Sequence, residues 1–170
     1  MDTKENTYVV HSNTMGNQVN YNTNHYTYIP DKIPVLLGDK GKLPVYKTKG
    51  SAGADLSANN TMILVPRGYG MVGTGISVSL PHNTVGLVFA RSGLASKGLT
   101  LANGVGVIDS DYRGEIKLCM YNMNEYPFEI QAGDRVGQIV VVPVHQFNWL
   151  AVTSLDSTER GTGGFGSTGV

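Results

Sequence analysis

The segment NGVGVIDSDYRGE, residues 103–115, holds the densest group of chemically useful side chains in the sequence. Asp109 follows two apolar residues, so we expect it to leave a buried strand, where partial desolvation would raise its basicity. Tyr112 stands three positions later and offers an aromatic face at the same rim. The amide of Asn103 can both donate and accept hydrogen bonds, and the two glycines after it let the backbone approach a ligand or form a hairpin tip. These residue types predict an acid/base centre with an aromatic lid.

Three other stretches place polar groups where a strand or a turn is expected. ARSG (90–93) sets a cation, a hydroxyl group and a glycine at the end of an apolar run, a combination that suits an anion. SAGADL (51–56) is a small-residue turn that ends near a carboxylate, and GDRVGQ (133–138) reads as a turn before a buried strand. Each has an ordinary structural explanation when taken alone. Together with the 103–115 segment they predict an enzyme that acts on a phosphate ester or a nucleotide.

The C-terminal segment STERGTGGFGSTGV (157–170) has five glycines in its last ten residues. Such a segment cannot hold a core, and we expect it to be mobile. It carries one cation, Arg160, and one aromatic ring, Phe165. This pair suits a lid that closes over a ligand with an anionic part and a flat part, although composition alone also permits an inert tail.

The elements that must position these groups are predicted to be strands. From residue 33 to about residue 155 the chain shows short apolar runs broken by Gly, Pro and Asn, at 33–37, 62–65, 71–80, 84–90, 114–123 and 135–144. In the 114–123 run Ile116, Leu118 and Met120 alternate with more polar neighbours, as in a strand with one buried face. No long window shows a helical stripe. The pattern predicts an all-β fold, a sandwich or a barrel.

Three parts are expected along the chain. Residues 1–30 are rich in Asn, Thr and Tyr and cannot bury enough surface to fold alone, so we predict a polar arm that is disordered or lies on a partner surface. Residues 31–156 form the β core, and residues 157–170 form the lid.

Charge and composition exclude several classes of protein. Thirteen basic and thirteen acidic residues give a formal net charge of zero, which argues against binding to a nucleic-acid polymer or to an anionic membrane. The lone cysteine, Cys119, has no internal disulfide partner, and the four histidines share no metal-ligand spacing. The GYGMVG sequence at 68–73 matches a dinucleotide fingerprint but is followed by a strand-like run, so we set it aside. No secretion signal and no apolar run of about 18 residues is seen, and we expect an intracellular protein.

Five segments in order, SAGADL, ARSGLASKGL, NGVGVIDSDYRGE, GDRVGQ and RGTGGFGSTG, resemble the five motifs of the homotrimeric deoxyuridine triphosphatases (dUTPases). The resemblance covers residues 33–170. It implies a jelly-roll-like β fold and hydrolysis of dUTP to dUMP and pyrophosphate with Mg²⁺. It also implies a homotrimer in which each active site draws residues from all three chains.

The resemblance assigns roles residue by residue. Asp109 would be the general base that activates the attacking water. Tyr112 would lie under the deoxyribose and exclude a ribose 2′-hydroxyl group. The uracil would be read by Asn103 and by the Gly104–Ile108 hairpin, which includes Gly106, Val107 and Ile108.

The remaining roles concern the triphosphate and the closing of the site. The phosphates would be held by Arg91, Ser92, Gly93 and Gln138, and Lys117 joins the substrate-binding set. Arg160 would clamp the γ-phosphate, Phe165 would stack on the base, and Gly166 and Ser167 would close over the substrate. The metal would be held mainly by phosphates and water, so no protein ligand is assigned, and Asp55 is given at most an indirect role.

The sequence departs from the family pattern in three places. Ala90 stands where the family usually has proline, the stretch 97–103 is one residue shorter, and residues 1–30 have no counterpart in the motif set. Two alternatives stay open. A dCTP deaminase would share the fold but needs a glutamate at the base, for which no matching motif is present. A regulatory, protein-binding member of the family would use the N-terminal arm for an unidentified protein partner.

Overall fold

The computed structural model describes residues 32–165 and residue 167. The predicted N-terminal arm, residues 1–30, lies outside the described residues, as does Gly166 of the predicted lid. Of the three predicted parts, the structure therefore describes the β core from residue 32 and most of the C-terminal segment.

The described chain forms eleven strands and one short helix. In order these are β1 (Val35–Leu37), β2 (Ala54–Ser57), β3 (Met62–Leu64), β4 (Tyr69–Gly73), β5 (Ile76–Val78), β6 (Thr84–Phe89), α1 (Ser92–Ala95), β7 (Leu99–Leu101), β8 (Gly106–Ile108), β9 (Lys117–Asn122), β10 (Phe128–Ile130) and β11 (Arg135–Pro143). The all-β prediction is confirmed. Strands β2, β7, β8 and β10, each of three or four residues, and the four-residue helix α1 were not among the predicted apolar runs.

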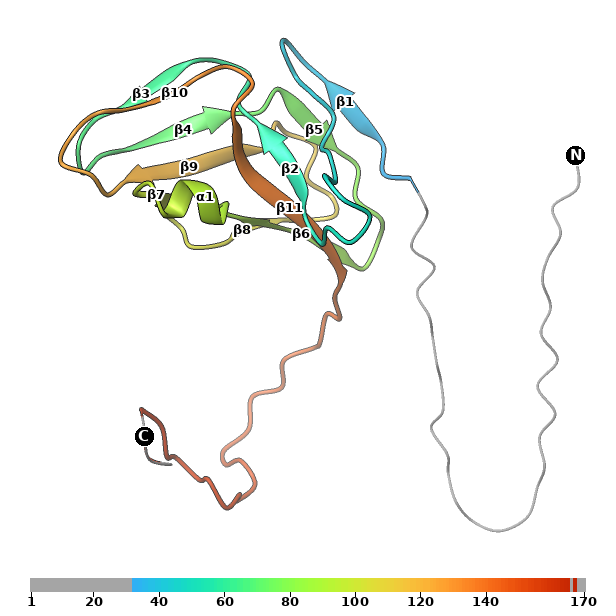
Figure 1. Ribbon diagram of the computed structural model, residues 1–170. Helices are drawn as coiled ribbons and strands as arrows, with labels where there is room; N and C mark the ends of the chain where they lie inside the picture. The colour runs from blue at the N-terminus through green and yellow to red at the C-terminus, as the bar shows by residue number, and fades with distance from the viewer. Residues whose placement is uncertain (1–31, 166, 168–170) are drawn as a thin grey trace, which may run out of the picture.

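The strands pair in four antiparallel sheets that wrap around one core (Figure 1). The largest has the order β2-β11-β6-β8 and the next has the order β4-β9-β7, while β1 pairs with β5 and β3 with β10. Strand β11 lies between β2 and β6, so it brings together segments that are far apart in the sequence. This arrangement of short antiparallel strands agrees with the predicted jelly-roll-like architecture.

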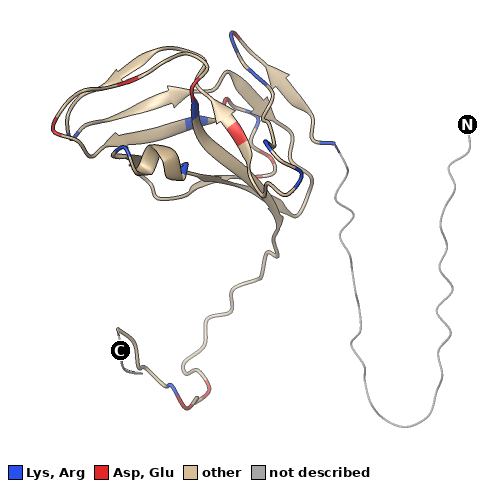
Figure 2. Cartoon of the chain, in the orientation of Figure 1, with Lys and Arg blue, Asp and Glu red and all other residues tan. Residues whose placement is uncertain are grey.

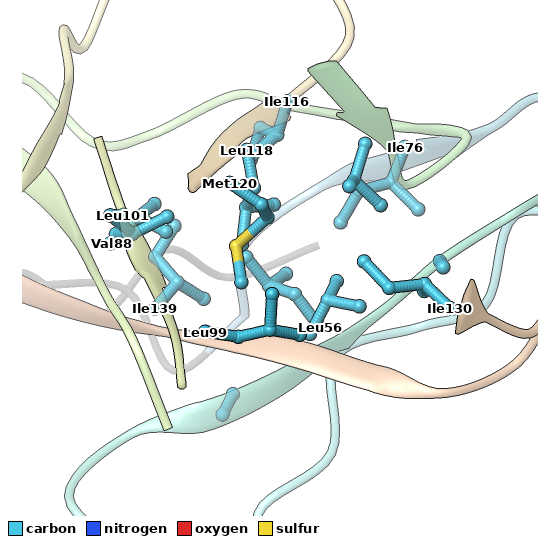
Figure 3. Packing of buried hydrophobic residues seen from close by; sticks show 14 of the residues in the cluster. Leu56, Ile76, Val88, Leu99, Leu101, Ile116, Leu118, Met120, Ile130 and Ile139 are labelled. Carbon is cyan, nitrogen blue, oxygen red and sulfur yellow. The ribbon is translucent and has the colours of Figure 1, made fainter. Parts of the chain in front are cut away.

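The core is built from the inward faces of these strands (Figure 3). On β9 and just before it, Ile116, Leu118 and Met120 are buried while the alternate residues are exposed or half-buried, as the period-two pattern predicts. The fully buried side chains that these residues meet come from several sheets and include Leu56, Leu64, Ile76, Leu99, Ile130 and Val136. Burial of this apolar surface is the main favourable contribution to folding.

One predicted run differs from the structure. The run 71–80 is divided between β4 and β5, because Gly75 turns the chain with φ +65°. A Cβ there would lie 2.9 Å from the backbone nitrogen of Gly41, so only glycine fits. The GYGMVG segment falls mainly in β4 and is followed by strand β5 instead of a helix, as expected for a chance match.

The strand pattern also ends earlier than predicted. The β6–β11 ladder stops at the pair Thr84 and Pro143, and one further hydrogen bond joins Val144 N–H to the Asn83 carbonyl. From residue 144 to residue 165 the chain runs as an extended segment away from the strands (Figure 1). It exposes large apolar side chains, Trp149 at 97% and Leu155 at 86%, because no strand in the described part of the chain covers them.

Along the described part of the chain, basic and acidic residues are interspersed (Figure 2). This agrees with the zero net charge. Within residues 32–165, the structure contains no helix of the length and apolar character that crossing a membrane requires.

Candidate active site

The first group of predicted site residues gathers where β2, β11 and β6 lie side by side. Asp55 on β2 stands opposite Gln138 on β11, and Gln138 in turn stands opposite Phe89, the last residue of β6. Arg91 follows two residues after Phe89 and precedes α1. Register alone therefore joins segments from three of the five motifs.

Side-chain contacts fix this group. Asp55 Oδ1 lies 3.0 Å from Arg91 Nε, and Asp55 Oδ2 accepts a hydrogen bond of 2.9 Å from Arg135 Nη1. The Asp55 side chain is only 12% exposed. Gln138 Nε2 donates to the carbonyl oxygen of Ala90 at 3.4 Å, which ties β11 to the chain just before Arg91.

These residues line a depression of ≈ 320 Å³, the phosphate-side depression. Its walls include the predicted residues Arg91, Ser92 and Gln138. The N–H groups at the start of α1, where Ser92 and Gly93 lie, have no acceptor within the helix and are available to an anion. The glycine of SAGADL is explained here as well, because a Cβ on Gly53 would lie 2.6 Å from Gln138 Oε1.

Two cations in this depression were missed by the sequence analysis. Arg135 lies within GDRVGQ, and its place beside Asp55 depends on the pairing of β11 with β2. Lys47 lies in no motif, and its position follows from a bridge between Val45 and Asp55. The positions of both residues depend on strand pairing, which the sequence alone did not predict.

The second group of predicted residues lines a separate depression of ≈ 470 Å³, the nucleoside-side depression. Its predicted members are Val107, Ile108, Asp109, Tyr112 and Lys117, and it has no lining residue in common with the phosphate-side depression. The end of β8, the loop after it and the start of β9 form it.

The loop between β8 and β9 is held in one shape by its own hydrogen bonds. Tyr112 N–H donates to the Asp109 carbonyl at 3.1 Å, and the Tyr112 hydroxyl donates to the Glu115 carbonyl at 3.1 Å. A Cβ on Gly114 would lie 2.6 Å from Tyr112 Cζ, so glycine is required for the ring to take this place.

Asp109 itself differs from the expectation. We predicted a carboxylate partly desolvated as it leaves a buried strand, but in the single chain Asp109 is exposed and β8 is only half-buried. The short strand lies at the edge of its sheet, and no other described strand pairs with its outer side. Nearby, Lys117 Nζ lies 3.4 Å from Glu115 Oε2.

The expected uracil-reading hairpin is also organised differently. Asn103 and Gly104 form a turn in which Gly104 has φ +70°. The strands on either side of it are not partners, because β7 pairs with β9 and β8, which contains Gly106, pairs with β6. The turn therefore passes from one sheet to another, and it presents an exposed Asn103 at its tip.

Within the single chain, none of the described C-terminal residues lines either depression. Arg160 and Phe165 are exposed, and the part of the segment that is described bonds only to itself, as in Ser167 N–H to the Gly164 carbonyl at 3.1 Å. In the described part of the chain no three His, Cys, Asp or Glu side chains are placed to hold a metal ion.

Comparisons with known proteins place these motifs in one family. The family model described as dUTPase matches residues 39–169. The deoxyuridine 5′-triphosphate nucleotidohydrolase of Desulfitobacterium hafniense strain Y51 is 51% identical over 144 residues, which span 82% of this chain and 95% of that protein. The protein of the same name from Corynebacterium diphtheriae is 47% identical over 130 residues, or 75% and 86% of the two chains.

Solved structures agree. The dUTPase of Staphylococcus bacteriophage 80alpha with dUPNHPP superposes with a TM-score of 0.78 at 29% identity, covering 83% of this chain and all of that one (100%). A mutant dUTPase from phage phi11 of S. aureus, described with a structural Mg(II) ion, has a TM-score of 0.68 at 26% identity and covers 73% and 98%. The predicted resemblance is thus confirmed, and this chain belongs to the dUTPase family.

Proposed function

We propose that this chain hydrolyses dUTP to dUMP and pyrophosphate, which keeps uracil out of DNA and supplies dUMP for thymidylate synthesis. The observation that carries the proposal is the shared depression of Asp109 and Tyr112, a carboxylate and an aromatic ring held by one hydrogen-bonded loop. The names of the similar proteins and the nucleotide analogue in the phage 80alpha structure support the same substrate.

Asp109 is the proposed general base. Its exposed carboxylate can accept a proton from a water molecule as that water attacks the α-phosphorus. A new P–O bond forms to the water oxygen, and the bond from the α-phosphorus to the oxygen bridging to the β-phosphate breaks. Pyrophosphate leaves with the electron pair.

The nucleoside-side depression and the Asn103–Gly104 turn would select the substrate. The ring of Tyr112 would lie under the deoxyribose and leave no space for a 2′-hydroxyl group. Asn103 with the backbone of Gly106, Val107 and Ile108 would bond the uracil. A base other than uracil would leave these hydrogen-bonding groups buried and unpaired, so the site would discriminate strongly against it.

The phosphate-side depression would hold the triphosphate. Arg91, Gln138 and the N–H groups at Ser92 and Gly93 offer charge and hydrogen bonds to phosphate oxygens. We also place Lys117, which lines the nucleoside-side depression, in the substrate-binding set.

We propose that the working enzyme is a homotrimer with shared active sites. The two depressions have no lining residue in common, and Arg160 and Phe165 lie at neither. The exposed apolar side chains of residues 144–155 would be covered by another copy. The C-terminal lid would then bring Arg160 to the γ-phosphate and Phe165 to the base, with Gly166 and Ser167 over the substrate.

The residues present fit Mg²⁺ that is held by the substrate. The described part of the chain offers no three-ligand cluster, and both carboxylate oxygens of Asp55 already contact arginines, so any part that Asp55 takes would run through water. Mg²⁺ commonly binds substrate phosphates and keeps several waters. When bound, it would neutralise charge that develops on the phosphates.

A direct test is pyrophosphate release from dUTP, dTTP, dCTP and UTP measured side by side. We expect release from dUTP alone. Ammonia released from dCTP would instead show a deaminase, and equal hydrolysis of all four would contradict the proposed base and sugar selection. Because the proposed substrate is a precursor of DNA synthesis, we place the enzyme inside the cell.

A further inference from the structure

Arg135 has no role in the function proposed above, yet it makes one of the best-defined side-chain contacts near the site. It begins β11, and its Nη1 donates to Asp55 Oδ2 at 2.9 Å. Its side chain is 41% exposed, while that of Asp55 is 12% exposed, so the bond reaches from the rim of the phosphate-side depression to its wall.

The side on which Arg135 lies is set by an irregularity of the sheet. In the β2–β11 ladder Gln138 stands opposite Asp55, and Arg135 stands opposite Ser57. Residues that face each other in a ladder share a face, and so do residues two apart on one strand. Gln138 and Arg135 therefore share the Asp55 face although they are three positions apart in the sequence.

A regular ladder would not allow this. The register shifts between Arg135 and Gly137, which makes Val136 an extra residue on its strand, a β-bulge. Without the bulge, Arg135 would stand opposite Ala58, which is 1% exposed and faces the core. The bulge thus turns a charged side chain out of the core and onto the wall of the phosphate-side depression.

Asp55 connects Arg135 to the phosphate-binding arginine. Its two oxygens are divided between the guanidinium groups, with Oδ1 at 3.0 Å from Arg91 Nε and Oδ2 bonded to Arg135. Arg91 Nη1 also donates to the Arg135 carbonyl at 3.3 Å. Two contacts therefore restrain the Arg91 guanidinium through its neighbours, and the Arg91 side chain is 27% exposed.

We propose that Arg135 is a positioning residue, which acts through Asp55 to fix the guanidinium of Arg91 for the triphosphate. The inference rests on the proposed function, in which Arg91 holds phosphate. If Arg135 is removed, the Asp55 carboxylate loses one of its two restraints, and Arg91 loses a fixed partner for Nε. An ion pair with no such role would affect stability slightly and catalysis not at all.

The test compares Arg135→Ala and Arg135→Lys with Arg67→Ala and Arg67→Lys. Arg67 is a matched control, because it also pairs with a carboxylate, that of Glu125, and lines neither depression. We expect kcat/KM for dUTP to fall about ten- to thirtyfold in Arg135→Ala, in the range of coupled charged networks, and less in Arg135→Lys, with melting temperatures close to those of the Arg67 variants. Equal kcat/KM values in the Arg135 and Arg67 variants would overturn the proposal.

A double-mutant cycle then tests the route through Arg91. In an Arg91→Ala background, the further change Arg135→Ala should cost almost nothing, because the residue that it positions is gone. Losses that multiply would overturn action through Arg91. Affinity for inorganic triphosphate should also fall, less in Arg135→Lys than in Arg135→Ala. Calorimetry measures this affinity without any turnover of substrate. If the wild-type chain binds inorganic triphosphate but does not hydrolyse dUTP, the proposed function is overturned. The affinities of the Arg135 and Arg67 variants for triphosphate would still test whether Arg135 positions Arg91.

Discussion

The backbone N–H of Tyr112 donates to the carbonyl oxygen of Asp109 at 3.1 Å, so the proposed base and the proposed sugar platform belong to one four-residue turn. We therefore expect a substitution that displaces one of these two residues to displace the other. The ring of Tyr112 also packs against Gly114, which leaves no room for a side chain there.

Asp109→Asn should lower kcat for dUTP by about 10²–10⁴-fold, the usual contribution of a general base, since an amide cannot accept the proton from water. The amide keeps the size of the carboxylate, so affinity for dUTP should change little. Steady-state pyrophosphate release and calorimetric binding measure the two quantities. Turnover close to that of the wild type would mean that another group is the base.

Gly114→Ala should displace the ring of Tyr112, because the added Cβ would lie 2.6 Å from Cζ. We expect kcat/KM for dUTP to fall about tenfold and the preference for dUTP over UTP to shrink, as misplaced contacts lose discrimination. Gly50→Ala is the control, since its Cβ meets nothing within 4 Å. An unchanged dUTP to UTP ratio in Gly114→Ala would contradict the role given to the ring.

Asn122→Ala should reduce the free energy of unfolding by about 2–3 kcal/mol, because it leaves buried and partly buried backbone carbonyls without partners. The Asn122 side chain is 0% exposed, and its Nδ2 donates to the carbonyl oxygens of Leu64 (3.1 Å), Val65 (3.2 Å) and Tyr126 (2.8 Å). Denaturant unfolding at matched protein concentration measures the change.

The control for this variant is Asn60→Ala. The Asn60 amide is exposed and donates to Asn59 Oδ1, so we expect a change within about 0.5 kcal/mol. Similar losses in both variants would mean that the buried amide adds nothing of its own.

Removal of residues 157–170 should abolish turnover and leave the melting temperature unchanged. The described part of this segment bonds only to itself, while it carries Arg160 and Phe165. Thermal unfolding and pyrophosphate release read out the two effects.

The same truncated chain tests sharing between copies. Mixed and refolded with Asp109→Asn chains, it should regain part of the activity, since some sites would combine an intact Asp109 with an intact lid from another chain. A mixture that stays inactive would contradict shared sites.

Glu125→Gln should destabilise the chain near neutral pH but not in acid. The hydrogen bond from Arg67, followed by its charge, holds the pKa of Glu125 below its usual value. A carboxyl whose pKa is lowered on folding stabilises the fold above its unfolded pKa, and this contribution is lost as the pH falls through the lowered value. The difference in unfolding midpoint between wild type and variant should therefore vanish at low pH. Both side chains are exposed, so the difference should be small and should shrink in salt.

Much of the fold was readable in the sequence because it depends on local patterns. Alternation at Ile116, Leu118 and Met120 predicted a strand with one buried face, and the structure confirms it. Patterns failed where strands were short or where one glycine changed the direction of the chain. Strand β8 has three residues, and Gly75 divides a run that looked continuous.

What the sequence by itself determined was the set of chemical groups and the family, since motif residues keep their types and their order along the chain. Tertiary structure decided which of them meet. Asp55, Arg91 and Arg135 come together only because β11 pairs with both β2 and β6. The side on which Arg135 lies depends on one extra residue in a ladder, because a shift by one position moves a strand side chain to the opposite face of the sheet.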